Sequence, residues 1–269
     1  MIKEIIFRLL GRRLVTSIRL KLFNRHDERD FLSGLLIHEG PRESLMLDVG
    51  AHFGESLKPF KDYGWRILAF EPDPDPRKKE ALRKFESDRV AFKWMAVSDE
   101  EGELPIYASD VSTGITSLMK FHESHRVVGH VPVTTLEKII SQEEIKKVTF
   151  LKTDCEGFDF MALKGYPWGG EVDPEVVLCE FEDRKTEKLG YRWQDMAQYL
   201  VERGYQVVVS EFHPISEYGE NHPWVGLKAF PCELNCPDAW GNLIAMKIND
   251  SPGSRMRQSL ASGATAAKP

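Results

Sequence analysis

The chain has 269 residues, 42% of them hydrophobic and 29% charged, an ordinary composition for a soluble globular protein with one doubly wound domain. Its net charge of -6 argues against a nucleic-acid partner, because domains that bind nucleic acids usually carry a dominant basic surface. Since the sequence shows no bilayer-length apolar run, no signal-peptide layout and only four cysteines, we expect a reduced, cytoplasmic protein.

Residues 1–40 are predicted to form a helical extension. Over residues 1–25, apolar side chains recur at helical spacing among lysines and arginines, at Ile2, Ile5, Ile6, Leu9, Leu10, Leu14, Ile18 and Leu22. This pattern is typical of a basic amphipathic helix. Such a helix can dock on the following domain or on a second subunit of a homo-oligomer, or it can make a peripheral contact with an anionic membrane surface. We favour docking.

An apolar run that begins at Met46 ends in an acid and two glycines, Asp48, Gly50 and Gly54. Such a run predicts a buried parallel strand that feeds a tight turn and a helix. Gly50 can take backbone angles that are closed to other residues and lets the main chain approach a ligand, and Gly54 can open the next helix. Open α/β sheets bind nucleotides in the crevice at such a strand end.

A second apolar run, residues 65–70, ends in Glu71, which follows Asp48 by about 20 residues, the spacing that places an acid on a ribose in a βαβ unit. A carboxylate at this position can accept hydrogen bonds from both ribose hydroxyls. The glycine turn and Glu71 together therefore predict a nucleoside cofactor.

The identity of this cofactor depends on His52. A dinucleotide site needs G-x-G-x-x-G, whose second glycine clears room for a pyrophosphate. His52 stands at that position and would crowd a pyrophosphate against the start of the helix. S-adenosylmethionine carries no phosphate and needs a close backbone with polar partners instead. We favour S-adenosylmethionine over a nicotinamide cofactor, and an α/β domain whose turn binds nothing is a third interpretation.

The middle of the chain alternates short elements with one long loop. The expected elements are a proline-rich turn at 72–76, a surface helix at 77–87, a third strand at 90–97, an antiparallel excursion at 104–108, a loop at 109–130, an edge strand at 131–136 and a helix from 136. The end of the third strand, Ala96, Val97 and Ser98, is where an adenine would lie. A loop as long as 109–130 is usually functional, and we expect it to form the acceptor-side wall.

Two further strands, at 148–153 and 176–183, carry acids at or beyond their ends. Asp154 and Glu156 follow the first of them, and Glu180 and Glu182 lie in the second. A single acid of this kind is usually a helix cap or a turn former. Together with the strands that end at Asp48 and Glu71, four strands end in acids, and we expect these four ends to converge on one crevice.

The remaining elements complete a seven-stranded, mostly parallel sheet with helices on both faces. We expect a helix at 193–204, a sixth strand at 205–210, an aromatic and polar loop at 211–224 that suits sugars, and a seventh strand at 242–247. The domain is predicted to span residues 41–250, and residues 251–269 are rich in Ser, Ala and Gly, as in a disordered tail.

Taken together, these stretches resemble the FkbM family of S-adenosylmethionine-dependent methyltransferases. The resemblance covers residues 45–246 and rests on DVGAHFG at 48–54, FEPDP at 70–74, AVSD at 96–99 with Gly102, LKTDCEG at 151–157 and LKG at 163–165. It implies a Rossmann-like class I methyltransferase fold and methyl transfer, often to a hydroxyl oxygen of a sugar or natural product. The residues expected to bind the cofactor are Asp48, Gly50, His52, Gly54, Glu71, Ala96, Val97, Ser98 and Asp154.

A hydroxyl acceptor must lose its proton, so we expect Asp154 or Glu156 to act as the catalytic base, with His213 as a second candidate. The same acids could bind a divalent cation such as Mg²⁺, with Glu180 or Glu182 as a further ligand. The alternative function from another class is a catalytically inactive methyltransferase fold that serves as a binding partner in glycan synthesis.

Overall fold

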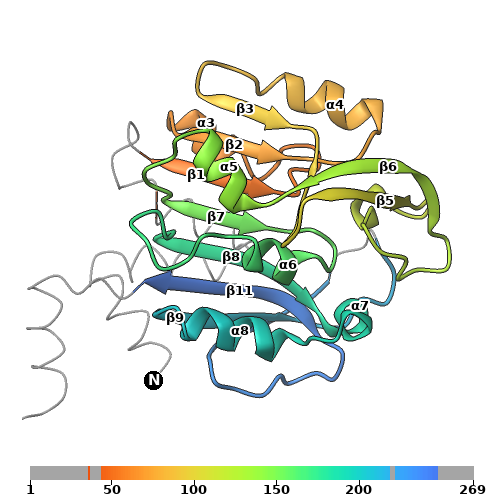
Figure 1. Cartoon of the computed structure of the whole chain (residues 1–269). Coiled ribbons are helices and arrows are strands. Elements are labelled where there is room, and N and C mark those ends of the chain that lie inside the picture. The colour runs from red at the N-terminus through yellow and green to blue at the C-terminus, as the bar shows by residue number, and fades with distance from the viewer. Residues whose placement is uncertain (1–35, 37–43, 219–221, 248–269) are drawn as a thin grey trace, which may run out of the picture.

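The computed structural model of the chain describes residue 36 together with residues 44–218 and 222–247 (Figure 1). The predicted N-terminal helix and the predicted tail therefore lie outside the described residues, apart from Leu36, which is buried. No helix in the described ranges is long and apolar enough to cross a membrane.

Eight strands form the main sheet, and the predicted Rossmann-like α/β class is confirmed. In spatial order they are β10 (Trp224–Ala229), β9 (Tyr205–Phe212), β11 (Trp240–Lys247), β8 (Val176–Glu182), β7 (Phe150–Thr153), β1 (Leu45–Val49), β2 (Arg66–Phe70) and β3 (Val90–Lys93). Every pairing from β3 to β8 is parallel, whereas β11 runs antiparallel to both β8 and β9. The expected count of seven strands is one too low, because β10, which follows a stretch rich in loop-forming residues, pairs with β9.

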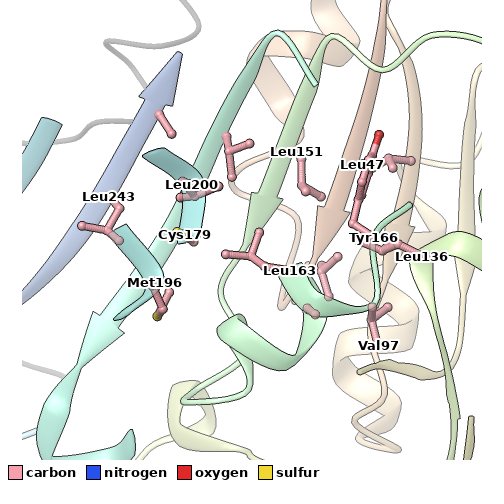
Figure 2. Close-up of a cluster of buried hydrophobic side chains, with 14 of the residues drawn as sticks. Leu47, Val97, Leu136, Leu151, Leu163, Tyr166, Cys179, Met196, Leu200 and Leu243 are labelled. Atoms are coloured by element: carbon pink, nitrogen blue, oxygen red, sulfur yellow. The ribbon is translucent and has the colours of Figure 1, made fainter. Parts of the chain in front are cut away.

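Helices cover both faces of the main sheet, as expected. One face packs against α3 (Lys58–Asp62) and α4 (Pro76–Arg83). The other face packs against α5 (Leu136–Gln142), α6 (Asp159–Lys164) and α8 (Trp193–Val201). Since side chains alternate along a strand, each central strand contributes to both cores. Figure 2 shows the second core, where Leu47, Leu151 and Leu243 from the strands lie near Leu163 and Leu200 from the helices.

Local sequence explains where these helices begin. The Asp75 carboxylate accepts a hydrogen bond from the Arg77 N–H at 2.8 Å and caps α4. Pro76 is the first residue of α4, so the proline-rich turn ends one residue earlier than expected; a proline lacks only an N–H that has no helical partner at this position. The Thr135 hydroxyl caps α5 by accepting from the Lys138 N–H at 3.1 Å.

A second sheet of three strands lies beyond the carboxyl ends of the parallel strands (Figure 1). Its order is β4 (Ala96–Val97), β6 (Arg126–Thr134) and β5 (Gly102–Ala108). Two predictions are corrected here. The strand expected at 90–97 divides, because the chain leaves the main sheet after β3 and joins the second sheet as β4. The strand expected at the edge is β6, which lies in the centre of its sheet between β4 and β5.

Candidate functional site

A cavity of about 920 Å³ lies at the carboxyl ends of the parallel strands. One side is lined from the turn after β1, the end of β2 and the second sheet, and the other from β8, β9 and β11. The cavity therefore spans the point between β1 and β7 where the strand order reverses, the usual ligand site of open α/β sheets.

Gly50 begins the turn after β1 and lines the cavity. Its φ is +86°, a left-handed angle that favours glycine. A Cβ at this position would lie 1.9 Å from the carbonyl oxygen of Asp154. The expected close approach to Gly50 is therefore made by the chain's own backbone, where the ends of β1 and β7 meet.

Asp48 lies behind this turn and outside the cavity lining. Its carboxylate is fully buried and accepts hydrogen bonds from the Ser56 hydroxyl at 2.5 Å and from Lys152 Nζ at 2.9 Å. Lys152 Nζ also donates to the Gly50 carbonyl at 3.2 Å and lies 3.6 Å from Asp154 Oδ2. Asp48 thus fixes the turn through Lys152, while Lys152 itself lines the cavity.

Lys152 was missed in the sequence, although a lysine inside the apolar run at 148–153 is a signal. A buried ammonium needs carboxylate partners. Burial lowers the pKa of Lys152, but the neighbouring Asp48 and Asp154 raise it further, so the net shift is upward and the side chain stays charged.

Glu71 lines the cavity and is almost fully buried. Its two carboxylate oxygens accept the N–H groups of His52 at 2.7 Å and Asp73 at 2.9 Å. Burial raises the pKa of Glu71, and Lys78, 3.9 Å away, opposes that shift. Each carboxylate oxygen can accept a second hydrogen bond. Glu71 is thus a fixed acceptor pair that faces the cavity.

His52 has a φ of +52° and lines the cavity beside Glu71. Its Nε2 lies 3.4 Å from the Thr113 hydroxyl, and its Nδ1 lies 3.8 Å from the Glu55 carboxylate. The imidazole therefore joins the first turn to the loop that follows β5.

The other residues expected at the cofactor divide into two groups. Ala96 and Val97 are buried and line the cavity. Ser98 is not in its lining, because its carbonyl faces Gly165, where a Cβ would lie 2.1 Å from that oxygen. Gly54 is outside the lining too, since a Cβ there would lie 2.8 Å from the Phe85 ring. It does not open the helix, because α3 begins only at Lys58.

Three carboxylates gather at the other side of the cavity. Asp154, Glu156 and Glu180 line it, and one oxygen from each lies within 4.8 Å of the others. Burial raises the pKa of Glu156 to about 7 and raises that of Glu180 well above its usual range. Glu182 does not join them, because its carboxylate pairs with Arg184 at 2.9 Å.

A buried lysine, Lys185, lies behind this carboxylate cluster. Its Nζ is 2.6 Å from Glu156, 2.8 Å from Glu182 and 3.6 Å from Glu180. Burial lowers its pKa, but the three carboxylates outweigh burial, so the pKa lies well above its usual value. Lys185 was also missed in the sequence, since α7 (Asp183–Thr186) reads as a charged surface turn.

Aromatic rings cover Lys185 on its other side. Its Nζ lies 5.2 Å from the ring centre of Phe121 and 5.8 Å from that of Tyr218, both within reach of a cation–π contact. The two rings lie 6.2 Å apart. Lys185 therefore ties the loop after β5 and the segment after β9 to the carboxylate cluster.

His213, the second candidate base, lies outside the cavity. It is exposed and absent from the cavity lining, and its Nδ1 lies 3.4 Å from Cys236 Sγ. The histidines that line the cavity are His52 and His222. The sequence indicated a stretch that does line the cavity, but the side chain of His213, directly after β9, is not part of that lining.

The predicted wall at 109–130 and the predicted loop at 211–224 both contribute to the cavity lining, as does β11. The loop at 109–130 supplies Gly114, Thr116, Ser117 and Leu118. The stretch from the end of β9 onward supplies Phe212, His222, Pro223, Trp240 and Asn242.

Residues 48–207 match a known family, described as the Methyltransferase FkbM domain. The matched residues are more than half of the chain and contain Glu71, Asp154, Glu156 and Glu180. No curated protein matches the chain.

Several solved structures resemble this chain at low sequence identity. Precorrin-6y C5,15-methyltransferase from Geobacter metallireducens GS-15 is 12% identical with a TM-score of 0.34, and the match covers 80% of this chain and 88% of that one. TrmK from M. capricolum, in complex with S-adenosyl-homocysteine, is 8% identical with a TM-score of 0.42, covering 81% and 68%. Magnesium protoporphyrin IX methyltransferase (ChlM) from Synechocystis PCC 6803, with bound SAM, is 9% identical with a TM-score of 0.39, covering 87% and 84%.

Proposed function

The chain belongs to the FkbM methyltransferase family, and on this premise we propose that it transfers a methyl group from S-adenosylmethionine to a hydroxyl oxygen of a sugar, glycan or natural product. One observation carries the proposal. The fixed carboxylate of Glu71 and the carboxylate cluster of Asp154, Glu156 and Glu180 face the same cavity from opposite sides of the strand-order reversal. A nucleoside cofactor and an acceptor can therefore meet there.

The residues beside β1 and β2 fit S-adenosylmethionine. Glu71 keeps one acceptor site free on each carboxylate oxygen, which suits the two hydroxyls of a ribose. Ala96 and Val97 supply an apolar wall for an adenine. His52 occupies the place where a dinucleotide site needs a glycine, which argues against a nicotinamide cofactor.

When bound, S-adenosylmethionine supplies a methyl group on a positively charged sulfur. The acceptor oxygen forms a bond to that carbon, the carbon–sulfur bond breaks, and its electron pair stays on sulfur. The hydroxyl proton passes to a carboxylate of the chain. We assign this role to Glu156, because it lines the cavity and its pKa of about 7 suits a base that works near neutral pH. Asp154, beside it, is more exposed and lies 3.6 Å from Lys152.

A divalent cation is not needed to balance these acids, and here the proposal departs from the sequence-based expectation of Mg²⁺. The Lys185 ammonium lies within 3.6 Å of both Glu156 and Glu180, so it supplies the positive charge that an ion would bring. Asp154 has Lys152 at the same distance. Two side chains of the chain itself, Lys185 and Lys152, therefore supply counter-charge to the cluster.

Replacing Lys185 should uncover a metal site. In the wild-type protein we expect no binding of Mn²⁺ at micromolar concentrations and no effect of a chelator on methyl transfer. Lys185→Met is expected to bind Mn²⁺ at least about tenfold more tightly, because Glu156 and Glu180 lose their counter-charge and hard cations prefer carboxylate oxygens. Calorimetry with Mn²⁺ measures both proteins, and Lys185→Arg, which keeps the charge, is the matched control. Micromolar binding by the wild type would contradict the assignment.

Glu71→Gln should weaken the binding of S-adenosylhomocysteine by about 10- to 100-fold, because a charge-assisted hydrogen bond contributes about 1.5–3 kcal/mol. The amide also places an NH₂ group against an N–H of His52 or Asp73. Calorimetric titration measures the affinity. Glu86→Gln, an exposed change just beyond α4, is the control and should bind normally. Equal affinities for the two variants would remove Glu71 from the cofactor site.

The reaction itself can be tested without a known acceptor. Purified protein is incubated with methyl-labelled S-adenosylmethionine and a glycan fraction from cells that lack the protein. We expect label that resists mild alkali, as an ether does and an ester does not. A protein that binds S-adenosylhomocysteine but transfers no label to any fraction would favour the inactive binding protein over the enzyme.

A further inference from the structure

Strands β8, β11 and β9 form a floor under the second half of the cavity. Glu180 lies opposite Asn242, which lies opposite Ser210, so these three side chains share one face of the sheet. Two residues away, Trp240, which precedes Asn242 in β11, pairs with Phe212, which follows Ser210 in β9, and both share the same face. A polar row and an aromatic row therefore lie side by side.

The aromatic row is a rigid platform. The rings of Trp240 and Phe212 stack with their centres 4.7 Å apart and their planes at 24°. The ring of His222 meets Trp240 edge-on at 5.6 Å. All three residues line the cavity. Aromatic side chains that line a cavity offer apolar contact to the C–H groups of a ligand.

The polar row contains hydrogen-bonding groups that can bind a ligand. The side chain of Asn242 makes no hydrogen bond to any other described residue, although its amide offers two donors and an acceptor to the cavity. Among the described residues, the only ion pair of Glu180 opposite it is with Lys185, at 3.6 Å. A ligand that lies on the aromatic rings thus meets a carboxylate and an amide at its edge.

The cavity lining favours ligands without negative charge. Asp154, Glu156 and Glu180 line it, whereas their counter-ion Lys185 is 2% exposed and absent from the lining. An anion on the floor would meet the carboxylates and not the ammonium behind them. Like charges brought together in this way weaken binding.

The two lysines that do line the cavity are engaged elsewhere. Lys78 Nζ pairs with Asp73 at 2.8 Å, and Lys152 Nζ pairs with Asp48 at 2.9 Å. Both ammonium groups are buried beside the cofactor half of the cavity. Within the described part of the chain, the floor therefore has no lysine or arginine in its lining.

We propose that this floor binds the acceptor as a neutral polyhydroxylated ring and rejects sugars that carry phosphate or carboxylate. The apolar face of the ring lies on Trp240, and its hydroxyls bond to Glu180 and Asn242. The inference rests on the proposed methyl transfer and specifies its acceptor. It also places the reaction after a glycosyl transfer that has released the sugar from its nucleotide diphosphate.

The test is saturation-transfer NMR on the full-length protein loaded with S-adenosylhomocysteine. The probes are the neutral methyl glycosides of glucose, galactose, mannose and fucose. The anionic counterparts are the methyl glycoside of glucuronic acid, with its carboxylate free, and glucose 1-phosphate. We expect at least one neutral glycoside to bind, with the strongest transfer to the C–H protons of one ring face. Each anionic counterpart is expected to bind at least about tenfold more weakly.

Variants then locate the binding. Trp240→Leu should reduce the affinity of the neutral glycoside at least about tenfold, whereas Trp240→Phe should retain most of it, because the aromatic face is preserved. Trp168→Leu, a matched change in the core on the other side of the sheet, should have no effect. Binding of S-adenosylhomocysteine shows that each variant is folded.

Three results would overturn the inference: equal or tighter binding of the anionic sugars, unchanged binding by Trp240→Leu, or no binding of any neutral glycoside. In all three, intact binding of S-adenosylhomocysteine leaves the proposed methyl transfer standing. Loss of that binding in the wild-type protein would instead remove the proposed function together with this inference.

Discussion

Glu156→Gln is expected to lower methyl transfer by about 10²- to 10⁴-fold, the usual contribution of a general base. Glutamine keeps the shape of the side chain but cannot take the acceptor's proton. The readout is the rate at which labelled methyl appears in the glycan fraction, with cofactor affinity measured alongside. Asp154→Asn should lower the rate of methyl transfer no more than about tenfold, because Asp154 pairs with Lys152 and does not take the acceptor's proton.

The pH profile gives a second readout of the same residue. Because a base acts only when it is deprotonated, and burial raises the pKa of Glu156 to about 7, kcat/KM should rise from pH 6 to pH 8 and then level off. Glu156→Gln should remove this rise, and the exposed Glu100→Gln should keep both the rate and the profile. A wild-type profile that is flat over this range would contradict the assignment, as would full activity in Glu156→Gln.

Gly50→Ala is expected to lower the free energy of unfolding by more than about 4 kcal/mol, a loss reserved for a few severe mechanisms. A methyl group would lie 1.9 Å from the carbonyl oxygen of Asp154, so the ends of β1 and β7 would have to separate. That movement strains the hydrogen bond from the Asp154 N–H to the Val49 carbonyl, now 2.9 Å long. The left-handed backbone angle adds about 1–2 kcal/mol for an alanine.

Gly64→Ala is the matched control for this prediction. Its φ of +79° is close to that of Gly50, but no atom lies within 4 Å of a Cβ built there. Gly64→Ala should lower the free energy of unfolding only by the contribution of the left-handed backbone angle, about 1–2 kcal/mol. Urea unfolding at equilibrium measures both variants. If they lost the same stability, contact between the two strand ends would not be the reason for glycine at position 50.

Local patterns predicted most of the main sheet because its strands are short apolar runs punctuated by acids and glycines. The runs that begin at Met46, Trp65 and Val148 became β1, β2 and β7 within a few residues. The errors came from pairing between distant segments. Nothing in residues 90–97 indicates that the chain changes sheets after Lys93, and the central place of β6 depends on two partners far away in sequence.

The candidate site, too, could be predicted only in part. Residue type and spacing identified Glu71, Asp154 and Glu156, which all line the cavity. They could not show that Asp48 turns away from it, since that depends on Lys152 in another strand. The role of Lys185 could not be predicted from the sequence for the same reason. Its partners come from the turn after β7, from β8 and from two loops, and only the folded chain assembles them.

Calorimetric titration of the full-length protein with S-adenosylhomocysteine, with NADH as the control, tests the central claim most directly. Micromolar binding of S-adenosylhomocysteine and no binding of NADH is the predicted result, because Glu71 offers acceptors to a ribose and His52 fills the place of a pyrophosphate. Binding of NADH alone, or of neither ligand, would contradict a methyl donor in this cavity.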